Sequence, residues 1–143
     1  MLFRSVPDLS GVKEAIGGGP VLVHNGKVAE IKKPEGTLPY EMRSMWERHP
    51  RAAVGWNKTH FFLVEVDGRQ PSLSVGMTLK ELGEYMARLG CEEAMNLDGG
   101  GSAMFWAEGR IVNSPCDGRE RNVANSLIMV RKEKSPQIGR AHV

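Results

Sequence analysis

The sequence predicts a single domain of the mixed α/β class, with one mixed β-sheet and a few packed helices. Its 143 residues suffice for one domain with a real core, and 17 glycines and 8 prolines predict many turns and short strands. Several short apolar runs are separated by turn residues, which is typical of strands. The clearest helical spacing of apolar residues lies in residues 78–89. These observations argue against a helical bundle.

The N-terminal third is predicted to contain a helix, a hairpin and a weaker helical segment. The helix is expected over residues 7–16 and ends in a run of three glycines. Asn25-Gly26 lies between the apolar runs 21–24 and 27–31, and this dipeptide favours a type I′ hairpin turn. Residues 41–48 are expected to form one or two helical turns.

The middle of the chain is predicted to form two strands and a helix. The strands, residues 53–56 and 61–66, are joined by a polar turn. The helix begins at Thr78, whose spacing from Glu81 is that of a capping box, and Gly90 ends it. We assign this helix to the scaffold and expect no chemistry from it.

The C-terminal part is expected to form a hairpin and a last strand. The hairpin comprises residues 102–106 and 110–112, and the strand comprises residues 124–130. We predict that the domain covers residues 1–131. The tail, residues 132–143, has no periodicity, and its last six residues match the translation of a common sequencing adaptor. We hypothesise that this tail is a sequencing artefact.

Composition gives little support to several classes of function. The net charge of +2 offers no argument for nucleic acid or a membrane surface as a partner. No apolar stretch approaches the roughly 18 residues that span a bilayer. Cys91 and Cys116 lack the spacing of a zinc site and are predicted to be separate thiols. We predict no metal and no cofactor, and the sequence does not indicate the oligomeric state.

The stretch Asp98-Gly99-Gly100-Gly101-Ser102 is the strongest candidate for a site. It follows a short apolar run that is predicted to be a buried strand. Consecutive glycines allow positive φ angles and close approach of a ligand, and N–H groups in such a turn form a concavity that suits an anion. A plain turn in which the aspartate caps its own backbone is the alternative.

Further polar residues lie at the ends of predicted strands. Arginine presents a planar fork of donors that matches a phosphate or a carboxylate, so several arginines beside the glycines suggest an anionic substrate. Asp67 and Asp98 could form the pair of carboxylates that glycoside hydrolysis uses, although Asp67 precedes a glycine and is also a typical turn residue. The candidates in this group are Arg51, Asp67, Arg69, Asp98, Ser102, Asn113, Glu120 and Arg121.

Four motifs, taken in order, resemble the phosphodiester glycosidase family. They are RHPRAAVGW (48–56), VDGRQPSLSVGMTLKELGEYM (66–86), NLDGGGSAMF (96–105) and VNSPCDGRERNVANSL (112–127). The resemblance covers roughly residues 16–130. It implies a mixed α/β fold, cleavage of a sugar-1-phosphate diester at the glycosidic bond, a glycan or glycosyl-phosphate substrate and a location outside the cytoplasm. Similar domains occur in bacterial exopolysaccharide and cell-envelope proteins.

The resemblance also implies roles for individual residues. Asp98 or Asp67 would stabilise an oxocarbenium-like centre or activate water, while arginines hold the phosphate as leaving group. The family usually has serine at the position of Cys116, and its members carry further strands upstream, so we expect an N-terminally incomplete domain. The implied substrate-binding residues are Arg51, Arg69, Gly99, Gly100, Gly101, Ser102, Asn113 and Arg121.

Two alternatives come from other functional classes. One is a hydrolase of another envelope glycan, such as peptidoglycan or exopolysaccharide, in which the arginines contact a carboxylate. The other is a non-catalytic carbohydrate-binding module with the same fold. Turnover on a panel of glycosyl phosphates and cell-wall glycans would separate the enzymes, and binding without turnover would favour the module.

Overall fold

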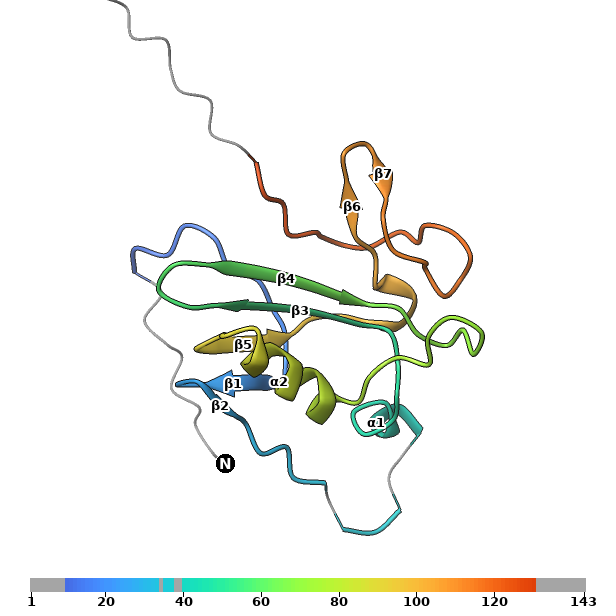
Figure 1. Ribbon diagram of the computed structural model, residues 1–143, viewed down its shortest axis with the longest axis horizontal. Coiled ribbons are helices and arrows are strands. Elements are labelled where there is room, and N and C mark those ends of the chain that lie inside the picture. Colours follow the sequence, from blue (N-terminus) through green and yellow to red (C-terminus); the bar gives the residue numbers. More distant parts are fainter. Residues whose placement is uncertain (1–9, 34, 38–39, 131–143) are drawn as a thin grey trace, which may run out of the picture.

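A five-stranded sheet with one helix packed on it organises the computed structural model, which describes residues 10–33, 35–37 and 40–130 (Figure 1). The strand order is β2-β1-β5-β3-β4, and all four pairings are antiparallel. The arrangement confirms the mixed α/β class. The strands are β1 (Val21–His24), β2 (Lys27–Val28), β3 (Arg51–Trp56), β4 (Phe61–Val66) and β5 (Glu93–Asn96).

The β1–β2 hairpin forms around the turn that the sequence predicts. Asn25 and Gly26 have φ angles of 50° and 72°, the two positive values that a type I′ turn requires. His24 pairs with Lys27 across the turn. The second strand ends at Val28, three residues earlier than expected.

Strand β3 lies between β4 and β5 and runs antiparallel to both. Arg51 at its start pairs with Val66 at the end of β4, and Ala53 pairs with Asn96 at the end of β5. The start of β3 therefore lies beside the ends of both neighbours, and the loops that follow them meet at one edge of the sheet. β4 has the predicted bounds, whereas β3 begins two residues earlier than predicted.

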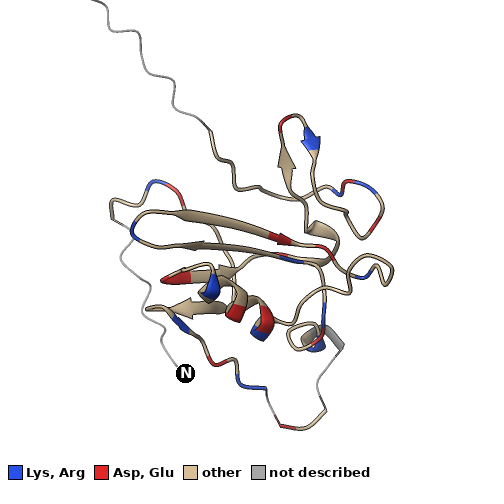
Figure 2. Ribbon diagram, in the orientation of Figure 1, with Lys and Arg blue, Asp and Glu red and all other residues tan. Residues whose placement is uncertain are grey.

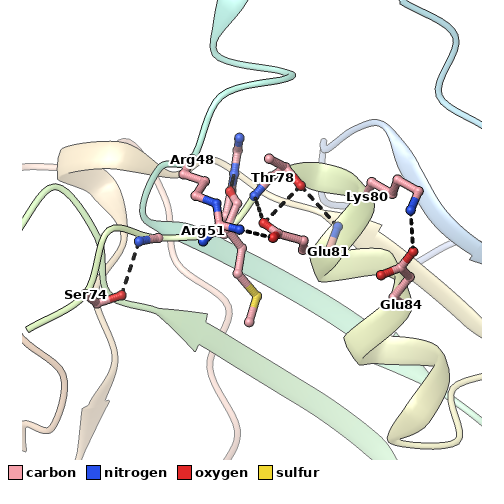
Figure 3. Close-up of polar contacts among 9 residues, drawn as sticks. Arg48, Arg51, Ser74, Thr78, Lys80, Glu81 and Glu84 are labelled. Carbon is pink, nitrogen blue, oxygen red and sulfur yellow. Dashed lines mark hydrogen bonds and ion pairs between the residues drawn. The ribbon is translucent and has the colours of Figure 1, made fainter.

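Helix α2 (Leu79–Arg88) covers one face of the sheet (Figure 1). Its predicted capping box is confirmed: the Thr78 hydroxyl accepts from the Glu81 N–H, and the Glu81 carboxylate accepts from the Thr78 N–H (Figure 3). The core under the helix consists of apolar side chains from α2, β1, β3, β5 and the turn between α2 and β5: Leu22, Val23, Ala53, Leu79, Leu82, Met86, Cys91 and Ala94. Charged residues lie mostly on the helix and the loops (Figure 2).

Three predicted elements differ from the structure. Residues 10–16 form no helix, and Gly11 has a φ of 85°, outside the helical region; residues 7–9 lie outside the described part. The weak segment forms only the four-residue helix α1 (Tyr40–Arg43) and a turn. Residues 124–130 form no strand, since no described strand lies beside them to complete a hydrogen-bond ladder.

The second hairpin is shorter than expected. It consists of β6 (Trp106–Ala107) and β7 (Arg110–Ile111), with positive φ at Glu108 and Gly109 in the turn. The predicted start of its first strand belongs to a 3₁₀ turn, η1 (Gly100–Ser102), which continues the glycine run. The proposed tail, residues 132–143, lies outside the described residues.

Candidate active site

Most of the predicted site residues meet where β3 begins and where β4 and β5 end. Arg51 opens β3, Arg69 follows β4, and the Asp98 loop follows β5. Two cavities lie here, of about 560 and 620 Å³. Asp98 lines both of them and is exposed to solvent.

The glycine loop is packed tightly against the start of β3. A Cβ at Gly99 would lie 2.6 Å from the carbonyl oxygen of Pro50, and the Gly100 N–H donates to that same oxygen at 3.0 Å. Gly100 has a φ of 61° and lies against the guanidinium of Arg69. The space where Gly101 lacks a side chain is filled by Asp117 and Arg121. Glycine is therefore required by close packing as well as by backbone conformation.

The N–H groups of this loop are used mainly inside the protein. Gly99 donates to the Asp98 carboxylate, Gly100 to Pro50, Ser102 to Gly99, and Ala103 to Gly100. The expected open cradle of N–H groups is therefore wrong for these four donors. The loop places Asp98 and Ser102, and side chains supply most of the polar groups that the cavities offer to a ligand.

Arg51 supports the architecture of the site. It is 7% exposed, and its guanidinium donates to three carbonyl oxygens, those of Ser44, Glu47 and Met77, at 2.6, 2.8 and 2.9 Å. These bonds fasten the turn after α1 and the start of α2 to the sheet; Figure 3 shows Arg51 beside the N-terminus of α2. Burial, and then the charge of Arg69, lower the pKa of Arg51.

The larger cavity is lined by two arginines and a histidine. Arg51, Arg69 and His49 contribute to its wall, and the Arg69 Nε donates to His49 Nδ1 at 3.2 Å. Burial, followed by the charges of Arg69 and Arg51, lowers the pKa of His49, which favours its neutral form. Asn96 lines the same cavity; it is 8% exposed, and its Oδ1 is buried without a hydrogen-bond partner among the described residues. This cavity thus offers positive charge, whereas the Asn96 Oδ1 is closed off from solvent.

The smaller cavity combines an apolar wall with three charged side chains. Asp98, Glu65 and Arg121 line it, together with Ser102. Burial raises the pKa of Glu65 to about 8, and the nearby Asp67 adds to this rise. Glu65 was not predicted from the sequence, although an acidic residue inside the apolar run FFLVEV was a signal that could have identified it.

Asp67 and Asn113 lie together, but they do not line either cavity. The Asp67 Oδ1 accepts from the Asn113 side chain at 3.0 Å and from the Ser114 N–H at 2.9 Å. The Asn113 amide also binds the Phe105 N–H and the Ala103 carbonyl. These contacts fasten the loop after β7 to the end of β4, so Asp67 and Asp98 do not face one shared cavity.

Cysteine and metal chemistry can be addressed for the described residues. Cys91 and Cys116 are not joined by a disulfide, which confirms that they are separate thiols. Within residues 10–33, 35–37 and 40–130, no group of three His, Cys, Asp or Glu side chains could hold a metal ion. No helix in the same residues is long and apolar enough to cross a membrane.

Comparison with known proteins identifies relatives in animals and in a bacterium. An N-acetylglucosamine-1-phosphodiester alpha-N-acetylglucosaminidase from Bos taurus is 32% identical over 116 residues, which are 80% of this chain and 21% of the bovine protein. The SPbeta prophage-derived protein YomE of Bacillus subtilis is 37% identical over 81 residues, 56% of this chain and 12% of YomE. The chain thus spans about a fifth or less of the length of these relatives.

A solved structure shares the fold. It is the catalytic domain of the zebrafish N-acetylglucosamine-1-phosphodiester alpha-N-acetylglucosaminidase, auto-inhibited by its pro-peptide. Its TM-score is 0.56 at 29% identity, over 70% of this chain and 34% of the zebrafish chain. Residues 3–130 match the family described as phosphodiester glycosidase. Since that match extends through both cavities and the loops around them, the chain belongs to the phosphodiester glycosidase family.

Proposed function

We propose that this protein hydrolyses the glycosidic bond of a sugar-1-phosphate diester in glycan or exopolysaccharide metabolism. The observation that carries the proposal is the position of Asp98, which lines both a cation-lined cavity and a second cavity. A glycosyl phosphodiester has two dissimilar parts joined at the bond to be cut. The phosphate occupies the cavity of Arg69 and Arg51, the sugar occupies the other cavity, and the bond between them lies at Asp98.

Charge supports this orientation of the substrate. Arginine side chains hold phosphate in a planar, bidentate geometry, and positive charge stabilises the phosphate as it leaves. Arg69 is exposed and contacts Gly100, so its guanidinium is available at the cavity wall. The carboxylate of Asp98 stabilises the positive charge that develops on the anomeric carbon or activates the attacking water.

The other predicted site residues have supporting roles in this proposal. Gly99, Gly100 and Gly101 allow the loop to approach Pro50, Arg69 and Arg121 closely. Asp67 and Asn113 hold the neighbouring loop in place through their mutual hydrogen bond. Ser102 and Arg121 line the sugar cavity. A location outside the cytoplasm remains part of the proposal and follows from the family.

Turnover of N-acetylglucosamine 1-(methyl phosphate) tests the proposal. Asp98→Asn preserves the shape of the side chain and removes its charge, so kcat should fall at least about 100-fold, the usual scale for losing an acid–base or charge-stabilising group. The matched control is Glu108→Gln at the tip of the β6–β7 hairpin, which should retain wild-type turnover. An Asp98→Asn enzyme with wild-type kcat would remove Asp98 from the chemistry.

The same assay addresses the two other functional classes. Turnover of peptidoglycan or exopolysaccharide fragments without turnover of the phosphodiester would indicate a hydrolase of another glycan. Binding of both ligands without any turnover would indicate a carbohydrate-binding module.

A further inference from the structure

Glu65 is a half-buried residue in the interior of β4, and its carboxyl is hydrogen-bonded only in part: the Val66 backbone contacts it, while one of its oxygens is buried without a partner in the described part of the chain. Side chains alternate between the faces of a strand, and Phe62, Val64 and Val66 pack toward the core under α2. Glu65 therefore lies on the opposite face, where it lines the cavity of Asp98. Its Oε1 is buried and has no hydrogen-bond partner among the described residues, none of whose ion pairs includes Glu65.

The register of the sheet places Glu65 and Asp98 on opposite sides of strand β3. Glu65 pairs with Ala52 on β3, and the Leu97 N–H donates to the Ala52 carbonyl at 2.8 Å. Glu65 and Leu97 are thus separated by two strand spacings, roughly 10 Å between their backbones. Ala52 between them has only a methyl group and lines the cavity, so a ligand can occupy the space above it.

The surroundings of Glu65 favour its neutral form. Burial raises its pKa to about 8, and the charge of Asp67, just after the strand, acts in the same direction, while the Val66 backbone acts against them. From the other elements, Asp98 and Arg121 line the cavity, and β3 presents the uncharged Ala52. At neutral pH the carboxyl therefore holds a proton that it can donate in a hydrogen bond.

We propose that Glu65 contacts the substrate as a neutral carboxylic acid, donating a hydrogen bond to an oxygen of the ligand in the cavity opposite Asp98. The nature of the ligand, a glycosyl phosphodiester, rests on the proposed function. Such a ligand is rich in acceptor oxygens and carries a negative charge. A neutral donor binds these oxygens, whereas a carboxylate would repel the phosphate.

The pH dependence of stability distinguishes this role of Glu65 from a structural role. The native protein retains a proton on Glu65 that the unfolded chain releases at the ordinary value of 4.5, so stability falls as pH rises from 4.5 to about 8 and then levels off. Replacing Glu65 by leucine or glutamine removes this loss. Both variants should unfold at a temperature at least as high as that of the wild type at pH 9.

The pH dependence of kcat/KM for N-acetylglucosamine 1-(methyl phosphate) tests the contact. In the wild type it should fall about tenfold per pH unit above about 8, as Glu65 ionises. Glu65→Gln retains a neutral donor, so it should lack this decline and stay within about tenfold of the wild type at pH 7. Glu65→Leu should lose about 10- to 100-fold at pH 7, and Glu108→Gln should behave as the wild type.

Binding separates failure of this inference from failure of the proposed function. Calorimetry with N-acetylglucosamine 1-phosphate at pH 7.0 and 9.5 should show weaker wild-type binding at the higher pH and no such change in Glu65→Gln. Without turnover, this binding pattern would overturn the proposed function and support the role of Glu65. The inference is overturned by wild-type kcat/KM in Glu65→Leu, by the same alkaline decline in Glu65→Gln, or by pH-independent wild-type binding in an inactive protein. Loss of stability in both variants at pH 9 would also overturn it.

Discussion

The two faces of the sheet differ in their side chains and in what covers them. The face under α2 is closed by apolar side chains, and Leu22, Leu82 and Met86 in it are completely buried. The opposite face carries Glu65 and a cavity that is bordered by residues 121–127, which form no regular secondary structure. The first face stabilises the domain, and the second tolerates a carboxyl whose Oε1 has no hydrogen-bond partner in the described part of the chain. This contrast predicts that substitutions on the two faces separate stability from activity.

The largest effect on stability is expected on the helix-covered face. Leu82→Ala removes a completely buried side chain and should lower the free energy of unfolding by about 2–5 kcal/mol. Leu73→Ala, at a position that is 62% exposed, is the matched control and should change it by less than about 0.5 kcal/mol. Urea denaturation followed by circular dichroism measures both. Equal losses for the two variants would contradict the assignment of the core.

A smaller effect on stability is expected at Asp67, which hydrogen-bonds the loop after β7 and lines neither cavity. Asp67→Ala leaves the Asn113 amide and the Ser114 N–H without their acceptor and should cost about 1–3 kcal/mol of stability. Asp67→Asn keeps a carbonyl oxygen that can accept these bonds, so kcat should stay within about tenfold of the wild type. A fall in kcat as large as that of Asp98→Asn would instead make Asp67 catalytic.

The smallest effect is expected at the start of α2. Thr78→Ala removes the side chain that accepts from the Glu81 N–H and should cost about 1 kcal/mol, while Thr78→Ser retains the acceptor and should cost less. Thermal unfolding measures the difference. Neither variant should alter turnover, because Thr78 lies outside both cavities. A selective loss of kcat would show that the helix start also shapes the site.

The sequence predicts the helix-covered face well because local signals determine its elements. The Thr78–Glu81 spacing, the apolar stripe of α2 and the Asn25-Gly26 turn each fix their own backbone within a few residues. The predicted strand at residues 124–130 is wrong because an apolar run specifies a strand only when a partner strand lies beside it. That partner is a property of the whole fold, and no local pattern contains it.

The site is predicted only in part because its contacts join distant segments. The sequence identifies Asp98, Arg51 and Arg69, and the antiparallel register brings all three to one cavity. It does not show that Asp67 is bound to Asn113, 46 residues away, or that the loop N–H groups are used internally. For Glu65, the sequence shows only an acidic residue inside an apolar run; that its Oε1 is buried without a partner among the described residues depends on side chains distant in sequence.

The position of Asp98 between two dissimilar cavities has a consequence for inhibitor chemistry. A small anionic fragment suits the arginine-lined cavity, and a neutral ring with acceptor groups suits the cavity of Glu65. Joined by a short linker that passes Asp98, the second fragment would bind at an effective concentration of about millimolar or higher, so two weak fragments could give a tight ligand without any new contact. Selectivity could then be adjusted in the cavity that contains Glu65, while the anionic half of the ligand stays constant.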